Sequence, residues 1–113
     1  MRRFIALIAL AQIALMVAVR VPLFAQSPGD EDRMSGANQL YEGGRYTAAA
    51  QAYEQLVDQG LLDSSLYYNL GNAYYNQGDI GRAIVAYLRA EKLAPRDTDV
   101  RANLDLAREQ NGA

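Results

Sequence analysis

The chain has 113 residues, which is enough for one small domain. It contains no cysteine and no histidine, which excludes a disulfide framework, thiolate chemistry and the most common general base and metal ligand. When Arg2, Arg3 and Arg20 are set aside with the apolar N-terminus, 8 of the 11 basic residues remain against 13 acidic ones, hence a net charge of -5. Binding to nucleic acid or to anionic membranes through bulk charge is therefore disfavoured.

The N-terminus is typical of an export signal. A short basic region at residues 1–3 precedes the apolar run from Phe4 to Val19, and Leu23 and Ala25 occupy the two positions that a signal peptidase reads. We therefore predict a signal peptide over residues 1–25 and an exported, periplasmic or otherwise extracytoplasmic protein. The alternative is an uncleaved membrane anchor within residues 4–25, although the run is short of the ~20 apolar residues that a span requires.

A linker is predicted over residues 26–32, before the domain at residues 33–110. Ser27-Pro28-Gly29 breaks regular structure, and the acidic run Asp30-Glu31-Asp32 follows it. Acidic residues in a first turn complement the helix dipole, so we interpret this run as the solvated start of a helix.

The most informative stretch runs from Leu66 to Asp97. Apolar residues recur there at three- and four-residue steps on both sides of Gly78-Asp79, which predicts two amphipathic helices. Gly78 suits the left-handed end of the first helix, and Asp79 suits the N-cap of the second. Small residues at Gly71 and Ala83 should let the two backbones approach closely.

This stretch resembles a tetratricopeptide repeat (TPR). The residues that carry the resemblance are Tyr67, Leu70-Gly71, Tyr74, Ala83, Tyr87, Ala90 and Pro95. A second copy lies 34 residues earlier. The matching pairs are Tyr87 with Tyr53, Ala83 with Ala49, Gly78 with Gly44, and Gly71 with Ala37. The resemblance implies an all-α helical-hairpin solenoid with repeats at about 30–63 and 64–97. Tyr53, Tyr74 and Tyr87 fall at core positions of these repeats, so we expect them to pack in the core and not to stack on bases.

A last amphipathic helix is predicted over residues 98–110. Val100, Leu104 and Ala107 share one face, and Asp97 or Thr98 can cap its start. We interpret it as a solvating cap on the second repeat, with a third repeat cut short as the alternative. The expected architecture is five helices in antiparallel pairs that form a short right-handed superhelix.

No residue pattern points to catalysis, a cofactor or a metal. The loop at residues 78–81 lacks the spacing and the lysine of a phosphate-binding loop. Asp97, Asp99 and Asp105 lack the loop glycine and the glutamate of a calcium loop, so we interpret them as caps and surface charges. The chain is predicted not to be an enzyme and to hold no cofactor.

The resemblance also implies a binding face, because the first helix of each repeat lines the concave side of such proteins. The predicted peptide- or protein-binding residues are Asn38, Tyr41, Tyr68, Asn69, Asn72, Tyr75 and Asn103. Asn38 and Asn72 match the asparagine that holds the ligand backbone in peptide-binding members, and an amide offers both a donor and an acceptor. Because these groups should point away from helix contacts, we expect changes at Asn72 and Tyr75 to spare folding.

The sequence departs from the family in one respect that bears on the ligand. Met34, Asp99 and Asn103 replace basic residues of the chaperone-binding carboxylate clamp, which argues against a C-terminal carboxylate as ligand. The alternative to a binding face is that the seven residues named above are merely soluble surface residues.

The stretch from Asn38 to Ala107 is also similar to exported TPR proteins of the bacterial aerotolerance type. We predict a protein-binding adaptor of the bacterial cell envelope, with no nucleic acid partner and with a membrane link only through an uncleaved N-terminal segment. The alternative is a structural subunit that self-assembles through its exposed terminal repeats, and sedimentation over a concentration range would separate the two.

Overall fold

A computed structural model describes residues 29–112, so the predicted signal peptide lies outside the described residues. This part of the chain is built of α-helices, and no strand occurs in it. The helices are α2 (Asp30–Glu42), α3 (Tyr46–Asp58), α4 (Ser64–Gln77), α5 (Ile80–Leu93) and α6 (Thr98–Gly112). None of the described helices is both long enough and apolar enough to span a bilayer.

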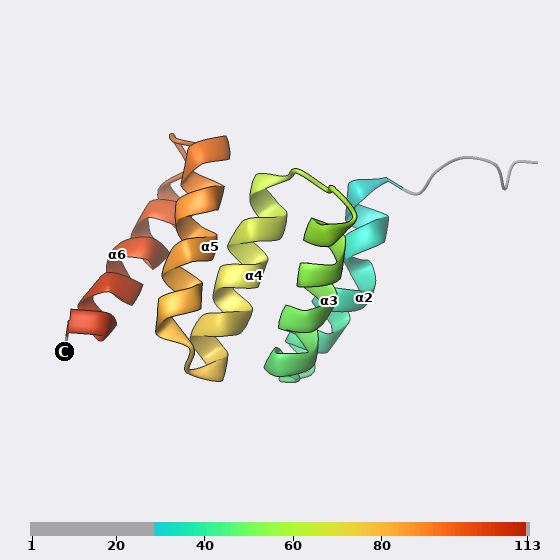
Figure 1. Cartoon of the computed structure of the whole chain (residues 1–113), viewed down its shortest axis with the longest axis horizontal. Coiled ribbons are helices and arrows are strands. Elements are labelled where there is room, and N and C mark those ends of the chain that lie inside the picture. Colours follow the sequence, from blue (N-terminus) through green and yellow to red (C-terminus); the bar gives the residue numbers. More distant parts are fainter. Residues whose placement is uncertain (1–28, 113) are drawn as a thin grey trace, which may run out of the picture.

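The helices stand side by side in chain order (Figure 1). Each one packs chiefly on its neighbours in the sequence, as short connections between antiparallel helices require. The first helix of each unit begins at Asp30, Ser64 and Thr98, at the 34-residue interval expected from the sequence. This layered stack is the helical solenoid that the repeat pattern predicts.

Glycines end three of the helices where only a left-handed backbone completes the turn. Gly44, Gly60 and Gly78 have φ values of 75°, 86° and 91°, and no other residue in the described part has a positive φ. A side chain is strained in this region, whereas glycine is not. The prediction that Gly78 ends the first helix of the second repeat is confirmed.

Aspartates start three of the helices. Asp63 accepts hydrogen bonds from the backbone N–H groups of Ser65 and Leu66 at 2.7 and 3.2 Å. Asp97, one repeat later, accepts from those of Asp99 and Val100 at 2.9 and 3.2 Å. Asp79 accepts from the backbone of Arg82 at 3.2 Å. These bonds satisfy helix N–H groups that have no partner in the helix, so Asp79 and Asp97 are the N-caps expected from the sequence.

Helix α2 begins earlier than the predicted linker ends. Asp30, Glu31 and Asp32 form its first turn, so the interval 26–32 is not all linker. The acidic side chains lie beside the positive end of the helix dipole and favour this earlier start. The interpretation of the acidic run as a solvated helix start is confirmed.

The core contains two repeat-related tyrosines and the leucines beside them. The largest fully buried side chains are Tyr53, Tyr87, Leu66, Leu70, Leu104 and Val100. Gly71 on α4 lies directly against the Tyr87 ring on α5, where an added Cβ would stand 2.5 Å from Cε1. The predicted close approach at Gly71 is therefore made by a tyrosine ring lying on the glycine.

Helix α6 covers the second repeat and turns a polar face outward. Val100, Leu104 and Ala107 are buried, as expected, but the helix continues to Gly112, two residues beyond its predicted end. Arg101 and Arg108 occupy the positions that the buried Tyr67 and Tyr74 hold one repeat earlier, and both are exposed. Charged groups there disfavour the stacking of a further helix, which fits the interpretation of α6 as a solvating cap.

Candidate functional site

Two adjoining hollows lie along one face of the stack. The first has a volume of about 310 Å³ and the second about 270 Å³, and Tyr41 lines both. The first is lined by Tyr41, Tyr68, Asn72, Tyr75, Asn76, Tyr87, Asn103 and Leu106. The second is lined by Asn38, Tyr41, Glu42, Tyr53 and Asn69. We call the two hollows together the groove; it contains all seven residues predicted from the sequence to line a binding face.

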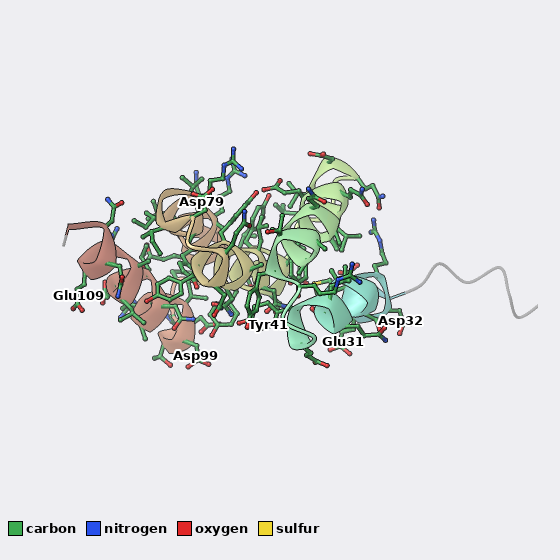
Figure 2. The ribbon with its side chains drawn as sticks, turned by 90° about the horizontal axis from the view of Figure 1, so that it is seen from below. Glu31, Asp32, Tyr41, Asp79, Asp99 and Glu109 are labelled. Carbon is green, nitrogen blue, oxygen red and sulfur yellow. The ribbon has the colours of Figure 1, made fainter. Side chains whose placement is uncertain are left out.

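The groove lies on the side of the molecule to which α2 and α6 project. In Figure 2, Tyr41 lies on the same side as Glu31 of α2 and Asp99 of α6. Asp79, in the turn before α5, lies on the opposite side. The groove residues come mainly from α2, α4 and α6, the first helices of successive units, with Tyr53 and Tyr87 reaching in from α3 and α5.

Asn72 is the centre of a hydrogen-bond network in the first hollow. The Tyr87 hydroxyl donates to Asn72 Oδ1 at 2.6 Å, and Asn103 Nδ2 donates to the same oxygen at 2.9 Å. Asn103 Nδ2 also donates to the Tyr68 hydroxyl at 3.1 Å. One amide oxygen on α4 thus connects α5 and α6.

The same network occurs one repeat earlier in the second hollow. The Tyr53 hydroxyl donates to Asn38 Oδ1 at 2.6 Å, and Asn69 Nδ2 donates to it at 3.3 Å. The set Asn38, Tyr53 and Asn69 therefore corresponds at 34 residues to Asn72, Tyr87 and Asn103. Sequence reasoning assigned the two tyrosines to packing alone. The recurrence of both asparagines at the repeat interval was the signal that could have revealed the network.

This network corrects one sequence-based expectation. Asn72 was expected to point away from helix contacts, so that its replacement would spare folding. Its Oδ1 instead accepts from two other helices, and its removal would leave the Tyr87 hydroxyl without that partner in a half-buried site. Because an unpaired buried polar group costs about 1–3 kcal/mol, Asn72 contributes to stability as well as to the groove.

Burial raises the pKa of three tyrosines of the groove, Tyr41, Tyr53 and Tyr87. Desolvation is the main cause that raises the pKa of Tyr53 to about 12, and it also raises the pKa of Tyr87. Desolvation raises the pKa of Tyr41 as well, with smaller contributions from Tyr46 and Tyr68. Burial disfavours the charged phenolate, so these groups remain neutral hydrogen-bond donors at neutral pH.

Three further features of the groove bear on what it can hold. Asn76 Nδ2 donates to the Tyr41 hydroxyl at 3.0 Å and to the Asn72 carbonyl at 2.8 Å, although the sequence did not single out Asn76. Leu106, another unpredicted member, is 46% exposed and presents an apolar wall from α6. Tyr75 is half-buried against the core and forms no side-chain hydrogen bond within residues 29–112.

The opposite face carries charged hollows of a different kind. The Tyr74 hydroxyl donates to Glu54 Oε1 at 2.7 Å, and the Arg82 guanidinium lies 5.8 Å from the centre of the Tyr74 ring. The pKa of Tyr74 is raised to about 12; burial is the largest cause, and the hydrogen bond to Glu54 is the next largest. Arg89 lies in the same way 5.8 Å from the Tyr67 ring. On this face Tyr74 and Glu54 pair with each other and the two guanidinium groups lie over aromatic rings, whereas the groove presents neutral groups with unused hydrogen-bonding capacity.

The comparisons with known proteins agree with this architecture. The family model described as "Tetratricopeptide repeat" matches residues 35–98, more than half of the chain. No curated protein matches the chain. Among residues 29–112, no group of three or more acidic side chains is arranged to hold a metal ion.

Proposed function

Because the chain belongs to the tetratricopeptide repeat family, whose members generally mediate protein–protein interaction without catalysis, we propose that it is an adaptor that holds a peptide or protein segment in the groove. The observation that carries the proposal is that all seven residues expected on the binding face line two adjoining hollows. Tyrosine and asparagine side chains supply contact area together with hydrogen bonds, as protein-binding surfaces commonly do.

Self-assembly through the ends of the stack is the less supported alternative. The exposed large apolar residues do not form one terminal face; they are Leu62, Val85, Leu88, Leu93 and Leu106. The first four lie on the α3–α4 connection and α5, and Leu106, on the last helix, lines the groove. Arg101 and Arg108 make the outer side of α6 polar, which disfavours end-to-end packing.

The first test removes a groove side chain that forms no side-chain hydrogen bond within residues 29–112, and melting curves check that the variant, which loses some packing against the core, still folds. Tyr75→Ala should weaken binding of a partner identified by cross-linking in envelope extract by about 2 kcal/mol, or roughly thirtyfold in Kd, because it removes an aromatic contact. Arg89→Ala, on the opposite face, is the control and should leave Kd unchanged. Both are measured by titration of the purified partner. Weaker binding by Arg89→Ala with normal binding by Tyr75→Ala would move the binding site to the other face.

We also propose that the adaptor acts outside the cytoplasm, in the manner of exported TPR proteins of the aerotolerance type. The support is the basic start and apolar run of residues 1–25 and the resemblance over Asn38 to Ala107. Intact-mass analysis of the exported protein is expected to show a chain that begins near Gln26. Recovery of the full-length chain in the membrane fraction would instead show that the segment is an uncleaved anchor.

A further inference from the structure

We infer that the face opposite the groove carries a second docking surface, which binds an acidic segment of a partner protein that also bears a large apolar side chain. The surface is a hollow of about 210 Å³ near the C-terminal end of α5, and we call it the α5 hollow. No groove residue lines it; its lining residues are Leu62, Tyr67, Arg89, Lys92 and Leu93. A second site there lets the adaptor hold two partners at once, which goes beyond the proposed function.

The apolar part of the α5 hollow is made by residues from three segments. Leu62 of the α3–α4 connection is 71% exposed, and Leu93 at the end of α5 is 40% exposed. Tyr67 of α4 is buried and lines the same hollow. Exposed apolar residues that gather at one hollow mark a place where another molecule packs, since covering them removes apolar surface from water. A hollow of this size has room for one large apolar side chain.

Arg89 presents a positioned cation at the α5 hollow. Its guanidinium lies 5.8 Å from the centre of the Tyr67 ring, a distance at which a cation is attracted to an aromatic face. Within residues 29–112 it forms no ion pair and no hydrogen bond, so its N–H groups remain available. A planar guanidinium can bind a carboxylate through two parallel hydrogen bonds. Because the ring already restricts this side chain, binding an anion costs it little further conformational freedom.

Lys92 adds a second positive charge one turn further along α5. It is exposed and forms no ion pair within the described part of the chain. No acidic residue lines the α5 hollow: Glu91, the acidic residue of α5, is absent from its lining, and the Asp63 carboxylate caps the start of α4. Two cations without an acidic neighbour, in a domain with a net charge of -5, complement an acidic partner.

The rest of this face is less attractive to an anion. A neighbouring hollow shares Arg89 with the α5 hollow and adds Arg82, which lies two turns earlier on α5, roughly 10 Å away along the helix axis. Arg82 already lies 3.6 Å from the Asp79 carboxylate, on the side that Figure 2 shows opposite the groove. Glu54 lines the neighbouring hollow and adds a negative charge. An acidic segment therefore meets the strongest positive field at the α5 hollow.

Acidic and apolar groups together satisfy the α5 hollow. Carboxylates of the segment pair with Arg89 and Lys92, and its apolar side chain covers Leu62 and Leu93. The groove differs, because every side chain that lines its first hollow is neutral and offers a carboxylate no cation. The α5 hollow therefore selects a segment that the groove does not attract, and both sites can be occupied at once because they share no residue.

The test reverses one charge at the α5 hollow and the same charge elsewhere. Lys92→Glu is the main variant, because Lys92 is exposed and has no ion-pair partner within residues 29–112 whose loss would disturb the fold. Arg89→Glu is the second. Arg108→Glu, at an exposed position of α6 away from both sites, is the matched control. Melting curves of the full-length variants establish that each one folds.

The probe is a library of random peptide segments, depleted on Lys92→Glu and then selected on the full-length wild-type protein. We expect the retained segments to combine two or more acidic residues with a large apolar one. Synthetic copies with both ends blocked should bind Lys92→Glu and Arg89→Glu about tenfold or more weaker in Kd, and Arg108→Glu and Tyr75→Ala as tightly as wild type. Raising the salt concentration from about 0.05 M to about 0.5 M should also weaken this binding, because ions screen the exposed charges.

Several results would overturn the inference. If no acidic segment is retained, or if Arg108→Glu weakens binding as much as Lys92→Glu, the α5 hollow is not a specific docking surface. Weaker binding by Tyr75→Ala with normal binding by Arg89→Glu would place the acidic segment in the groove.

Two further measurements address other occupants of the α5 hollow. A dimer in sedimentation that Lys92→Glu dissociates would assign the surface to a second copy of the chain. Flotation with phosphatidylserine vesicles that Lys92→Glu abolishes would assign it to a membrane, and either result would contradict a partner segment. The groove is tested with its own partner, so either site can fail without the other.

Discussion

Tyr87→Ala is expected to lower the free energy of unfolding by about 3–5 kcal/mol, the largest effect of any single substitution considered. The Tyr87 ring is 2% exposed and lies on Gly71, and its hydroxyl donates to Asn72 Oδ1. Its removal leaves a cavity between α4 and α5 and breaks one bond of the groove network. Because small domains have only about 5–15 kcal/mol of stability in total, this loss is a large share of it, and the variant should unfold at a much lower urea concentration than wild type.

Urea unfolding followed by circular dichroism measures this effect. Leu88→Ala, at the next position on α5, is the control, because Leu88 is 40% exposed and its loss should cost much less. Tyr87→Phe keeps the ring and removes only the hydroxyl, so its cost should be about 1 kcal/mol. Wild-type stability of Tyr87→Ala would show that α5 does not present this residue to α4.

Gly71→Ala is expected to destabilise the protein by about 1–3 kcal/mol, and Gly71→Leu by at least as much. An added Cβ would stand 2.5 Å from Tyr87 Cε1 and 2.6 Å from Cδ1, closer than such atoms approach one another. The ring cannot move away easily, because it is buried and its hydroxyl is bonded to Asn72. The two helices must therefore separate.

Thermal melting provides the measurement, and another helical glycine provides the control. Gly36 lies on α2, is exposed, and has no atom within 4 Å of an added Cβ. Gly36→Ala should raise stability by about 0.5–1 kcal/mol, because alanine is the better helix former. Opposite signs for the two glycine-to-alanine changes would demonstrate the contact at Gly71, and equal signs would contradict it.

The features that the sequence by itself determined are local or periodic. The turn glycines, the aspartate caps and the 34-residue interval between Asp30, Ser64 and Thr98 depend on residues close together in the chain. Helical periodicity also identifies which residues share a face, so Tyr53 and Tyr87 were correctly expected in the core. The same periodicity brought the seven groove residues to one side.

The tertiary structure alone decided how those groove residues are used. Spacing places Asn72 on a face, but it does not show which way the amide turns or which atoms of other helices reach it. Its two partners are 15 and 31 residues away, on α5 and α6, and are brought within hydrogen-bond distance only by the packing of three helices. An asparagine that looked like a free donor and acceptor therefore proved to have its acceptor filled, because its lone pairs are satisfied across the interface between repeats.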